Sequence, residues 1–215
     1  QDGGRGQRGR TWHAPPGTSA LFSFLLRFPN EGKDLSLLPL FLAERIAVAL
    51  EPLIDAAVQV KWPNDLLIAR RKICGILCEA TGSNGRIDGV VCGIGVNVNQ
   101  QKDDFPLEIR DHSQSLARVK GESLLREDVI SAILASIGAG MPHTEPITDL
   151  SVWKELCPDM GREICIDTPS GKVCGQFVDV SASGEIMVKT ASEEVWQFRS
   201  GSVRIKQESW HDPGY

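Results

Sequence analysis

The stretch Lys61-Trp62-Pro63-Asn64-Asp65 lies between two short apolar segments, residues 57–60 and 66–69. Both segments are typical of β-strands, and the sequence between them is typical of a turn, so the stretch predicts two strands joined by a tight connection. Pro63 also restricts the residue before it to an extended conformation. Lys61 is therefore expected at the end of a strand, where its ammonium group can serve as a fixed positive charge for a carboxylate or a phosphate.

The rest of the chain divides into a mixed part and an all-β part near residue 160. Apolar periodicity predicts helices at 35–54, 123–137 and 148–157. The expected strands lie at 19–28, 57–61, 66–69, 73–80, 87–98, 163–167, 172–180, 185–190, 193–198 and 202–206, with a hairpin turn at 83–86. The last strands are short and closely spaced, which is typical of a small barrel. The sequence thus predicts an α+β domain at residues 1–159 and an all-β module at residues 160–215.

Composition excludes several classes of protein. The 215 residues carry a net charge of −5, whereas general nucleic-acid binders normally carry a basic excess. The sequence has no apolar run of about 18 residues, so we expect no membrane-spanning helix. It begins without a methionine and without a signal peptide, which we interpret as a fragment or a processed form.

The six cysteines indicate a reducing compartment. They show neither a CxxC pair nor a spacing to histidine that suits zinc. Most of them lie in apolar or strand-like surroundings, where a small buried thiol is the simplest interpretation. We therefore expect reduced, structural cysteines in a cytoplasmic protein.

The segment Gly3–Trp12 is rich in glycine and arginine. Glycine lets a backbone approach a ligand closely, and the guanidinium groups of Arg5, Arg8 and Arg10 can each form two hydrogen bonds to a phosphate. The segment matches neither of the common glycine-rich nucleotide motifs, GxxxxGK[ST] and GxGxxG after a strand. Two interpretations are therefore open for this stretch alone, a phosphate or nucleotide clamp and an RGG-like tail that binds RNA weakly.

The run Gly93-Ile94-Gly95-Val96-Asn97-Val98-Asn99 places glycine at alternate positions of an expected strand. This pattern removes side chains from one face, so either a flat group lies against the backbone or the strand bulges or packs tightly there. Asn97 and Asn99 share a face and could hydrogen-bond a base edge or cap the following turn. Asp65 and Glu79 are acidic candidates for binding magnesium or for orienting the lysine, or are ordinary surface carboxylates.

Four stretches, in this order, resemble the motifs of the biotin protein ligase family. They are Gly4-Arg5-Gly6-Gln7-Arg8-Gly9-Arg10-Thr11-Trp12, Lys61-Trp62-Pro63-Asn64-Asp65, Lys72-Ile73-Cys74-Gly75-Ile76-Leu77-Cys78-Glu79 and Gly93-Ile94-Gly95-Val96-Asn97-Val98-Asn99. The resemblance covers nearly the whole chain, because the family also has a small SH3-like barrel that corresponds to residues from about 160 to 206. It implies a class II synthetase-like catalytic domain of mixed sheet and helices at residues 1–159, followed by that barrel within residues 160–215.

The resemblance implies a reaction in two steps. The carboxylate of biotin attacks the α-phosphate of ATP, with Mg2+ assisting, and gives biotinyl-5′-AMP and pyrophosphate. A lysine of a biotin carboxyl carrier protein domain, part of a biotin-dependent carboxylase, then attacks this mixed anhydride and forms an amide. Both steps build negative charge that fixed cations stabilise. The implied enzyme is an ATP-dependent, AMP-forming biotin–[biotin carboxyl-carrier protein] ligase.

The resemblance also implies roles for individual residues. Lys61 and Arg5 are the implied catalytic residues, with Lys61 contacting both the biotin carboxyl group and the phosphate. The implied biotin-binding residues are Gln1, Arg5, Gly6, Gln7, Trp12, Lys61, Gly75, Gly93 and Gly95. The implied residues of the ATP and adenylate site are Arg8, Arg10, Trp12, Lys61 and Asn97. No residue is assigned to the metal, because Mg2+ is expected to arrive with ATP.

The chain departs from the family pattern in two places. Position 7 is glutamine where the family loop most often has arginine, so we expect biotinyl-AMP to be held less tightly. The family also has a strand with a Ser-Thr-Asn motif before the arginine loop, which contacts the ureido ring of biotin and has no counterpart in this chain. We interpret this departure as truncation of a longer parent or as impaired activity. A parent with an N-terminal helix-turn-helix would also bind nucleic acid.

Three other functions compete with this interpretation. A lipoate ligase-type acyltransferase shares the fold, although Lys61–Asp65 and Gly93–Asn99 favour biotin. A second alternative is a protein that binds biotin or the carrier without turnover. The third is an RGG-type RNA-binding protein, which the negative net charge disfavours. Homodimerisation through sheet edges or the neighbouring loops is an expectation from the family alone.

Overall fold

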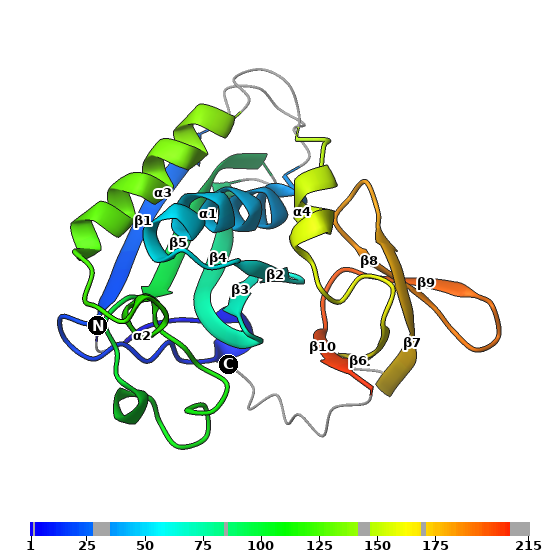
Figure 1. Cartoon of the computed structure of the whole chain (residues 1–215). Coiled ribbons are helices and arrows are strands. Elements are labelled where there is room, and N and C mark those ends of the chain that lie inside the picture. The colour runs from blue at the N-terminus through cyan, green and yellow to red at the C-terminus, as the bar shows by residue number, and fades with distance from the viewer. Residues whose placement is uncertain (2, 28–34, 84–85, 142–146, 169–170, 207–215) are drawn as a thin grey trace.

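The protein, seen in a computed structural model that describes residues 1, 3–27, 35–83, 86–141, 147–168 and 171–206, is built on two antiparallel sheets (Figure 1). The strands of the first sheet are β1 (Ser19–Arg27), β2 (Gln59–Lys61), β3 (Asp65–Ile68), β4 (Arg71–Ser83) and β5 (Arg86–Asn97). Those of the second sheet are β6 (Glu163–Thr168), β7 (Gly171–Val180), β8 (Ile186–Lys189), β9 (Val195–Phe198) and β10 (Ser202–Ile205). The strand order is β1-β5-β4-β3-β2 in the first sheet and β10-β6-β7-β8-β9 in the second.

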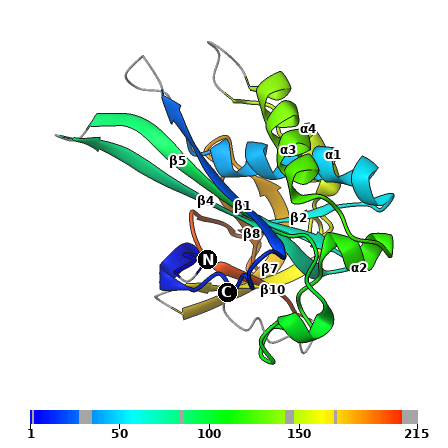
Figure 2. The ribbon, with the colours of Figure 1, turned by 90° about the vertical axis from the view of Figure 1, so that its left-hand side faces the viewer.

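The longer helices cover one face of the first sheet. The helices are α1 (Leu38–Ile54), α2 (Leu116–Lys120), α3 (Arg126–Gly140) and α4 (Ser151–Leu156), with short 3-10 helices η1 (Gln7–Gly9) and η2 (Lys102–Asp104). Helix α1 contacts β2, β3 and β4, while α3 contacts β1 and α1. Figure 2 shows α1 and α3 on one side of this sheet and the N-terminal segment on the other. The face opposite the helices is therefore available to the N-terminal segment and to a ligand.

Helix α1 is held by its apolar face. Leu42, Ile46 and Leu50 recur at the spacing of a helical turn and are fully buried. Burying each such side chain contributes roughly 1.5–3 kcal/mol. Pro39 is compatible with this helix because it falls in the first turn, where its missing N–H has no helical partner to lose. The helix ends at Asp55, which adopts the left-handed conformation.

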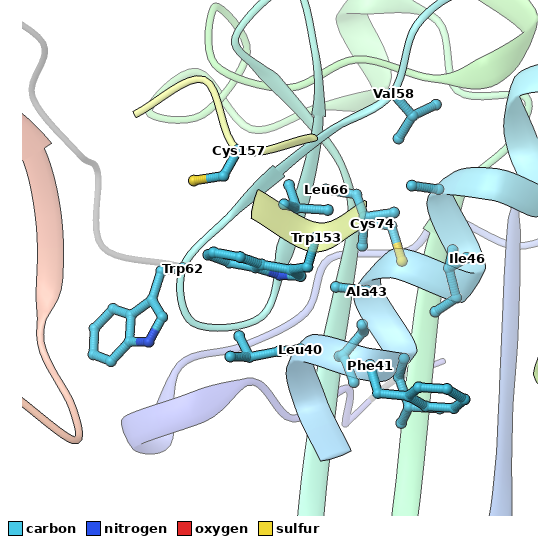
Figure 3. Close-up of a cluster of buried hydrophobic side chains, with 14 of the residues drawn as sticks. Leu40, Phe41, Ala43, Ile46, Val58, Trp62, Leu66, Cys74, Trp153 and Cys157 are labelled. Atoms are coloured by element: carbon cyan, nitrogen blue, oxygen red, sulfur yellow. The ribbon is translucent and has the colours of Figure 1, made fainter. Parts of the chain in front are cut away.

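Trp62 joins the two sheets at the turn after β2. Its indole is buried, and its Nε1 donates a hydrogen bond to the carbonyl oxygen of Gly184 in the second sheet's β7–β8 turn, at 2.9 Å. Figure 3 shows this side chain in the buried cluster that also contains Leu40 and Trp153. A second link is the ion pair between Arg70 and the buried carboxylate of Asp159, at 3.0 Å. The turn therefore fixes the second sheet against the first.

Most of the predicted elements are confirmed, with small shifts at their ends. Helix α1 begins at Leu38 rather than residue 35, and α3 spans Arg126–Gly140 rather than 123–137. Helix α2 was not predicted, since its one turn follows a polar, irregular stretch. The predicted hairpin turn at 83–86 includes residues outside the described ones, although β4 and β5 pair as far as Ser83 and Arg86. Within the described ranges no helix is long and apolar enough to span a membrane.

The expectation of six reduced cysteines was wrong for one pair. Cys165 and Cys174 form a disulfide, because they lie directly opposite each other on β6 and β7 with Cα atoms 4.0 Å apart. The other four cysteines are free thiols. The pairing of β6 with β7 could not be read from the spacing of the cysteines alone, so the sequence did not predict this bond.

The buried carboxyl of Glu44 in α1 should make stability depend on pH. Burial raises its pKa in the folded protein above the ordinary value of 4.5, although Arg45 and the backbone N–H of Trp153 oppose the shift. The folded state therefore binds its proton more tightly, and stability falls as the pH rises from about 4.5 through the folded pKa. We expect Glu44→Gln to weaken this fall and to unfold at higher urea concentration than the wild type at neutral pH. Glu155→Gln, which removes an exposed carboxylate of α4, is the control.

Candidate functional site

A cavity lies on the face of the first sheet opposite the helices. It has a volume of about 450 Å³. Its walls come from the N-terminal segment, β1, the turn after β2, strands β4 and β5, and the start of β10. Segments far apart in the sequence thus meet around one space, which is of the size that small-molecule sites usually have.

The indole of Trp12 lies flat on the middle of the sheet. A Cβ atom at Gly95 would come within 2.7 Å of the Trp12 ring, and one at Gly75 within 2.9 Å. Gly75 and Gly95 are directly opposite each other on β4 and β5. Only a residue without a side chain fits at either position, so at Gly95 the flat group, one of the two alternatives for the run at 93–99, is the protein's own tryptophan. At Gly93 the nearest atom to such a Cβ is 3.6 Å away, and this part of the bare strand faces the cavity.

The N-terminal segment forms a small closed loop over the cavity. The N–H of Gly6 donates to the carbonyl of Arg10 at 2.7 Å, and the N–H of Trp12 donates to the carbonyl of Gly4 at 2.9 Å. A Cβ at Gly4 would lie 2.4 Å from the Trp12 carbonyl oxygen, so this glycine is required by close approach. These bonds connect the conformation of the loop to the position of Trp12.

Two side chains of the loop reach other parts of the cavity wall. Arg5 forms an ion pair with Glu79 on β4 at 2.9 Å, with the two side chains 74% and 43% exposed. Exposed pairs of this kind contribute about 0–1 kcal/mol, so this one can open at little cost. Arg10 donates to the hydroxyl of Ser202 on β10 at 3.1 Å. The loop therefore touches both sheets.

Two lysines line the cavity, Lys61 and Lys72. Lys61 lies at the end of β2, as predicted, directly opposite Asp65 on β3. Asp65, however, forms its ion pair with Lys72, at 2.7 Å. The Lys72 side chain is only 14% exposed, and its Nζ lies 5.6 Å from the centre of the Trp12 ring. A cation over an indole face is attracted by the ring quadrupole, so Asp65 and the Trp12 ring together place the Lys72 ammonium.

Sequence reasoning missed Lys72 as a site residue because it falls between the expected strands at 66–69 and 73–80. Strand β4 in fact begins at Arg71, so Lys72 belongs to the sheet. The signal that could have found it is its position three residues before Gly75 in a quoted motif. Asn64 and Ser23 also line the cavity without having been assigned a role.

Most of the predicted site residues are brought together. The cavity wall includes Gln1, Arg5, Gly6, Gln7, Arg10, Trp12, Lys61, Gly75, Gly93 and Gly95. Asn97 is not part of that wall, because its amide is buried and hydrogen-bonded within the sheet. The side chain of Arg8 is outside what the structure describes. Asp65 and Glu79 both line the cavity, each paired with a cation.

Two features limit the chemistry of this site. Within the described ranges no group of three or more His, Cys, Asp or Glu side chains is arranged to hold a metal ion. Burial raises the pKa of the Cys74 thiol far above its usual range, so this neighbour of Gly75 is protonated and is not a nucleophile. The cavity is lined by cations, by the carboxylates of Asp65 and Glu79 and by the backbone of the glycine-bearing strands.

Comparison with known proteins identifies the family. Residues 1–97 match the family model described as the biotin/lipoate A/B protein ligase family. The biotin–[acetyl-CoA-carboxylase] ligase of Paracoccus denitrificans is 39% identical over 200 residues, which are 88% of this chain and 81% of that protein. The chain belongs to the biotin protein ligase family. The resemblance found in its sequence motifs is therefore confirmed.

Other members of the family extend the comparison. The bifunctional ligase/repressor BirA of Bacillus subtilis is 31% identical over 208 residues, which are 95% of this chain and 64% of that protein. The chain thus spans slightly less than two thirds of the length of that relative. The biotin protein ligase of Aquifex aeolicus, solved in complex with biotin and ATP, matches this structure with a TM-score of 0.81 and 29% sequence identity. The match covers 94% of this chain and 84% of the Aquifex chain. The two-sheet fold is thus that of a biotin protein ligase.

The contact between Trp12 and the bare strands gives a test of the loop. Gly95→Ala should push the indole off the sheet and open the loop, because the added methyl needs space that the ring occupies. We expect faster trypsin cleavage after Arg5 and Arg10, measured by mass spectrometry. Gly93→Ala is the matched control, since its methyl has room. Equal cleavage in the two variants would contradict the role given to the indole.

Proposed function

We propose that the protein is a biotin protein ligase, which activates biotin with ATP to biotinyl-5′-AMP and transfers biotin to a lysine of a biotin carboxyl carrier protein domain. The observation that carries the proposal is Lys72. Its largely buried ammonium lies on the wall of a cavity whose floor is formed by bare strands, in a chain of this family. A carboxylate and a phosphate that meet there would both face a fixed positive charge.

The first step joins two anions, and the site supplies what that needs. An oxygen of the biotin carboxylate attacks the α-phosphorus of ATP, and the bond to the bridging oxygen breaks, so pyrophosphate leaves. Lys72 and Lys61 reduce the repulsion between the two anions and stabilise the charge on the α-phosphate oxygens. Asp65 keeps the Lys72 ammonium oriented through their 2.7 Å ion pair. The charges are in place before the reaction, so little reorganisation is needed.

The glycine-bearing strands suit the biotin part of biotinyl-5′-AMP, and the N-terminal loop suits its phosphate part. Gly93, with Leu77 and Val91 nearby, offers an apolar slot for the ring system of biotin. Arg5 is held only by an exposed pair with Glu79, so it can exchange that carboxylate for an anionic ligand. Closure of the loop then excludes water from a mixed anhydride that water would hydrolyse. Gln7 supplies no charge where the family most often has arginine, which favours release of the intermediate.

The second step uses an amine from another protein. The uncharged amino group of the acceptor lysine attacks the carbonyl carbon of biotinyl-5′-AMP, an amide forms, and AMP leaves with the electron pair of the broken C–O bond. The same cations stabilise the negative charge on the departing phosphate. Residues 1–159 form the proposed class II synthetase-like catalytic domain. Residues 160–215 form the proposed SH3-like barrel, whose β10 closes one side of the cavity.

Magnesium fits this site as a companion of ATP. Mg2+ keeps several waters and is often bound by one or two carboxylates together with substrate phosphates. Asp65 or Glu79, which both line the cavity, would be the carboxylate that holds it, because Asp65 lies opposite Gly75 and Glu79 lies four residues further along β4. The ion would supply charge neutralisation at the phosphates, and no further ligand is assigned.

The location of the protein and its assembly with other molecules are proposed from the family and from this chain. We propose the cytoplasm as its location, because the proposed reaction consumes ATP and four cysteines are free thiols, although a disulfide such as Cys165–Cys174 is rare in that compartment. A homodimer would form through a free edge of the first sheet, β1 or β2. Nucleic-acid binding is proposed only for a protein in which a helix-turn-helix precedes this chain.

The test is ATP–pyrophosphate exchange with biotin as the carboxylic acid. Biotin-dependent exchange would support the ligase, and its absence from a protein that is folded by circular dichroism would refute it. The matching family model covers lipoate ligases as well. Lipoate in place of biotin therefore separates the two, because exchange with lipoate alone would make the protein a lipoate ligase. Binding of biotin without exchange would identify a protein without turnover.

Substituting each lysine in turn measures how much Lys72 and Lys61 contribute to the rate of adenylate formation. We expect Lys72→Ala to slow adenylate formation by about 100-fold, the loss typical of removing one group that stabilises developing charge. Lys61→Ala tests the assignment made from sequence, and a variant that keeps more than about a tenth of the rate, a loss below ~1.4 kcal/mol, would remove Lys61 from the centre. Lys102→Ala, which changes an exposed lysine on η2, is the control.

A further inference from the structure

The side chain of Gln100, three residues beyond the end of β5, is fully buried and makes two hydrogen bonds. Its Nε2 donates to the hydroxyl oxygen of Ser19 at 2.6 Å and to Oδ1 of Asn97 at 3.0 Å. An amide nitrogen carries two hydrogens, so both are used. Gln100 therefore ties the start of β1 to the end of β5, behind the cavity rather than on its wall.

Gln100 sets the orientation of the neighbouring amide. Asn97 has one oxygen that accepts and one nitrogen that donates. Because Gln100 donates to the oxygen, the Asn97 nitrogen is directed toward the carbonyl of Lys72, to which it donates at 3.3 Å. If the amide of Asn97 rotated by 180°, its Oδ1 would face the carbonyl oxygen of Lys72 at about that distance, with no hydrogen between the two oxygens. The chain of bonds from position 100 therefore ends on the backbone of a cavity lysine.

The backbone of Lys72 needs such support because it lies at an irregularity in the sheet. Leu66 is opposite Cys74, whereas Leu67 is opposite Lys72, so Ile73 is an extra residue in β4. A bulge of this kind disrupts the ladder locally and re-aims a side chain. It lets Lys72 share the cavity face with Gly75, three residues away, although strict alternation would place the two on opposite faces.

Lys72 lies beyond the last pair of β4 with β5, Cys74 with Val96, and other segments supply its backbone hydrogen bonds there. The N–H of Lys72 donates to the carbonyl of His112 at 2.7 Å, and the N–H of Gln114 donates to the carbonyl of Lys72 at 2.9 Å. That carbonyl also accepts the bond from Asn97. The peptide groups of Lys72 are thus held by His112 and Gln114 and by the side chain of Asn97. The contribution of Asn97 depends on Gln100.

We propose that Gln100 is a positioning residue, which acts through Asn97 to hold the bulged backbone of Lys72 so that its ammonium points into the cavity. The step it serves, adenylate formation, rests on the proposed function. The positioning itself is a property of the fold and can be measured without catalysis.

The test removes the N–H donors of the Gln100 side chain and measures the effect on catalysis and on the reactivity of the Lys72 amine. Gln100→Met keeps the length of the side chain and places no charge in the interior, while Gln100→Glu keeps its shape and offers only acceptors when ionised. We expect both variants to lower kcat of biotin-dependent exchange by about ten-fold or more, with KM for biotin and ATP little changed, as for a misplaced catalytic group. Gln101→Glu makes the same chemical change at the next, exposed position and is the control.

Two further measurements separate positioning from a general loss of structure. Competitive labelling of lysine amines with acetic anhydride, read by mass spectrometry, should show faster modification of Lys72 in Gln100→Met and unchanged modification of Lys102. In an Asn97→Ala background, Gln100→Met should add no further loss of kcat, because the bond through which it acts is already gone. Thermal melting confirms that each variant is folded.

The outcomes distinguish this proposal from the proposed function. If the wild type shows no biotin-dependent exchange, the ligase proposal fails, and Lys72 labelling alone decides whether Gln100 positions the lysine. Unchanged Lys72 labelling in folded Gln100→Met would overturn the positioning role. An additional loss of kcat in the Asn97→Ala background would also overturn it, because Gln100 would then act by another route.

Discussion

The cavity depends on one contact, that of the Trp12 indole with the backbone of two neighbouring strands. The ring can lie there only because Gly75 and Gly95, opposite each other on β4 and β5, have no side chains. Once seated, the indole fixes the end of the arginine loop, offers an aromatic face to the Lys72 ammonium, and forms one wall of the cavity. The position of the charge, the path of the loop and the shape of the slot thus follow from the same stacking.

A second requirement is that both sheets contribute to one site. Trp62 binds the β7–β8 turn through Gly184, and Arg10 reaches Ser202 on β10 from the loop. The residues that meet at the cavity are separated by most of the length of the chain, so the site exists only after both sheets are formed and docked. This arrangement gives the second sheet a structural role in the site even though it supplies few of the charged groups there.

The sequence predicted the elements better than it predicted the chemistry of the site. Strands and helices carry their own periodicity, so the order of strands along the chain and the helices α1, α3 and α4 could be read directly. The glycines of β5 indicated a flat partner, but only the pairing of β4 with β5 shows that Trp12 is that partner. Lys61 was predicted at a strand end and lies there, whereas Lys72 was missed because the expected strand began at residue 73, while β4 begins at Arg71. The disulfide between Cys165 and Cys174 was missed for a different reason, since strand register is a property of two segments and neither one reveals it alone.

The extra residue in β4 makes this site sensitive to the register of the strand as well as to its composition. If β4 kept Ile73 but paired with β3 without the bulge, regular alternation would turn the ammonium of Lys72 toward the helices, although every charged group of the site would still be present. Deleting Ile73 together with the bulge would instead leave Lys72 two residues from Gly75, the spacing that places two residues on one face of a strand. The register of β4, rather than its length, therefore decides on which face this charge lies.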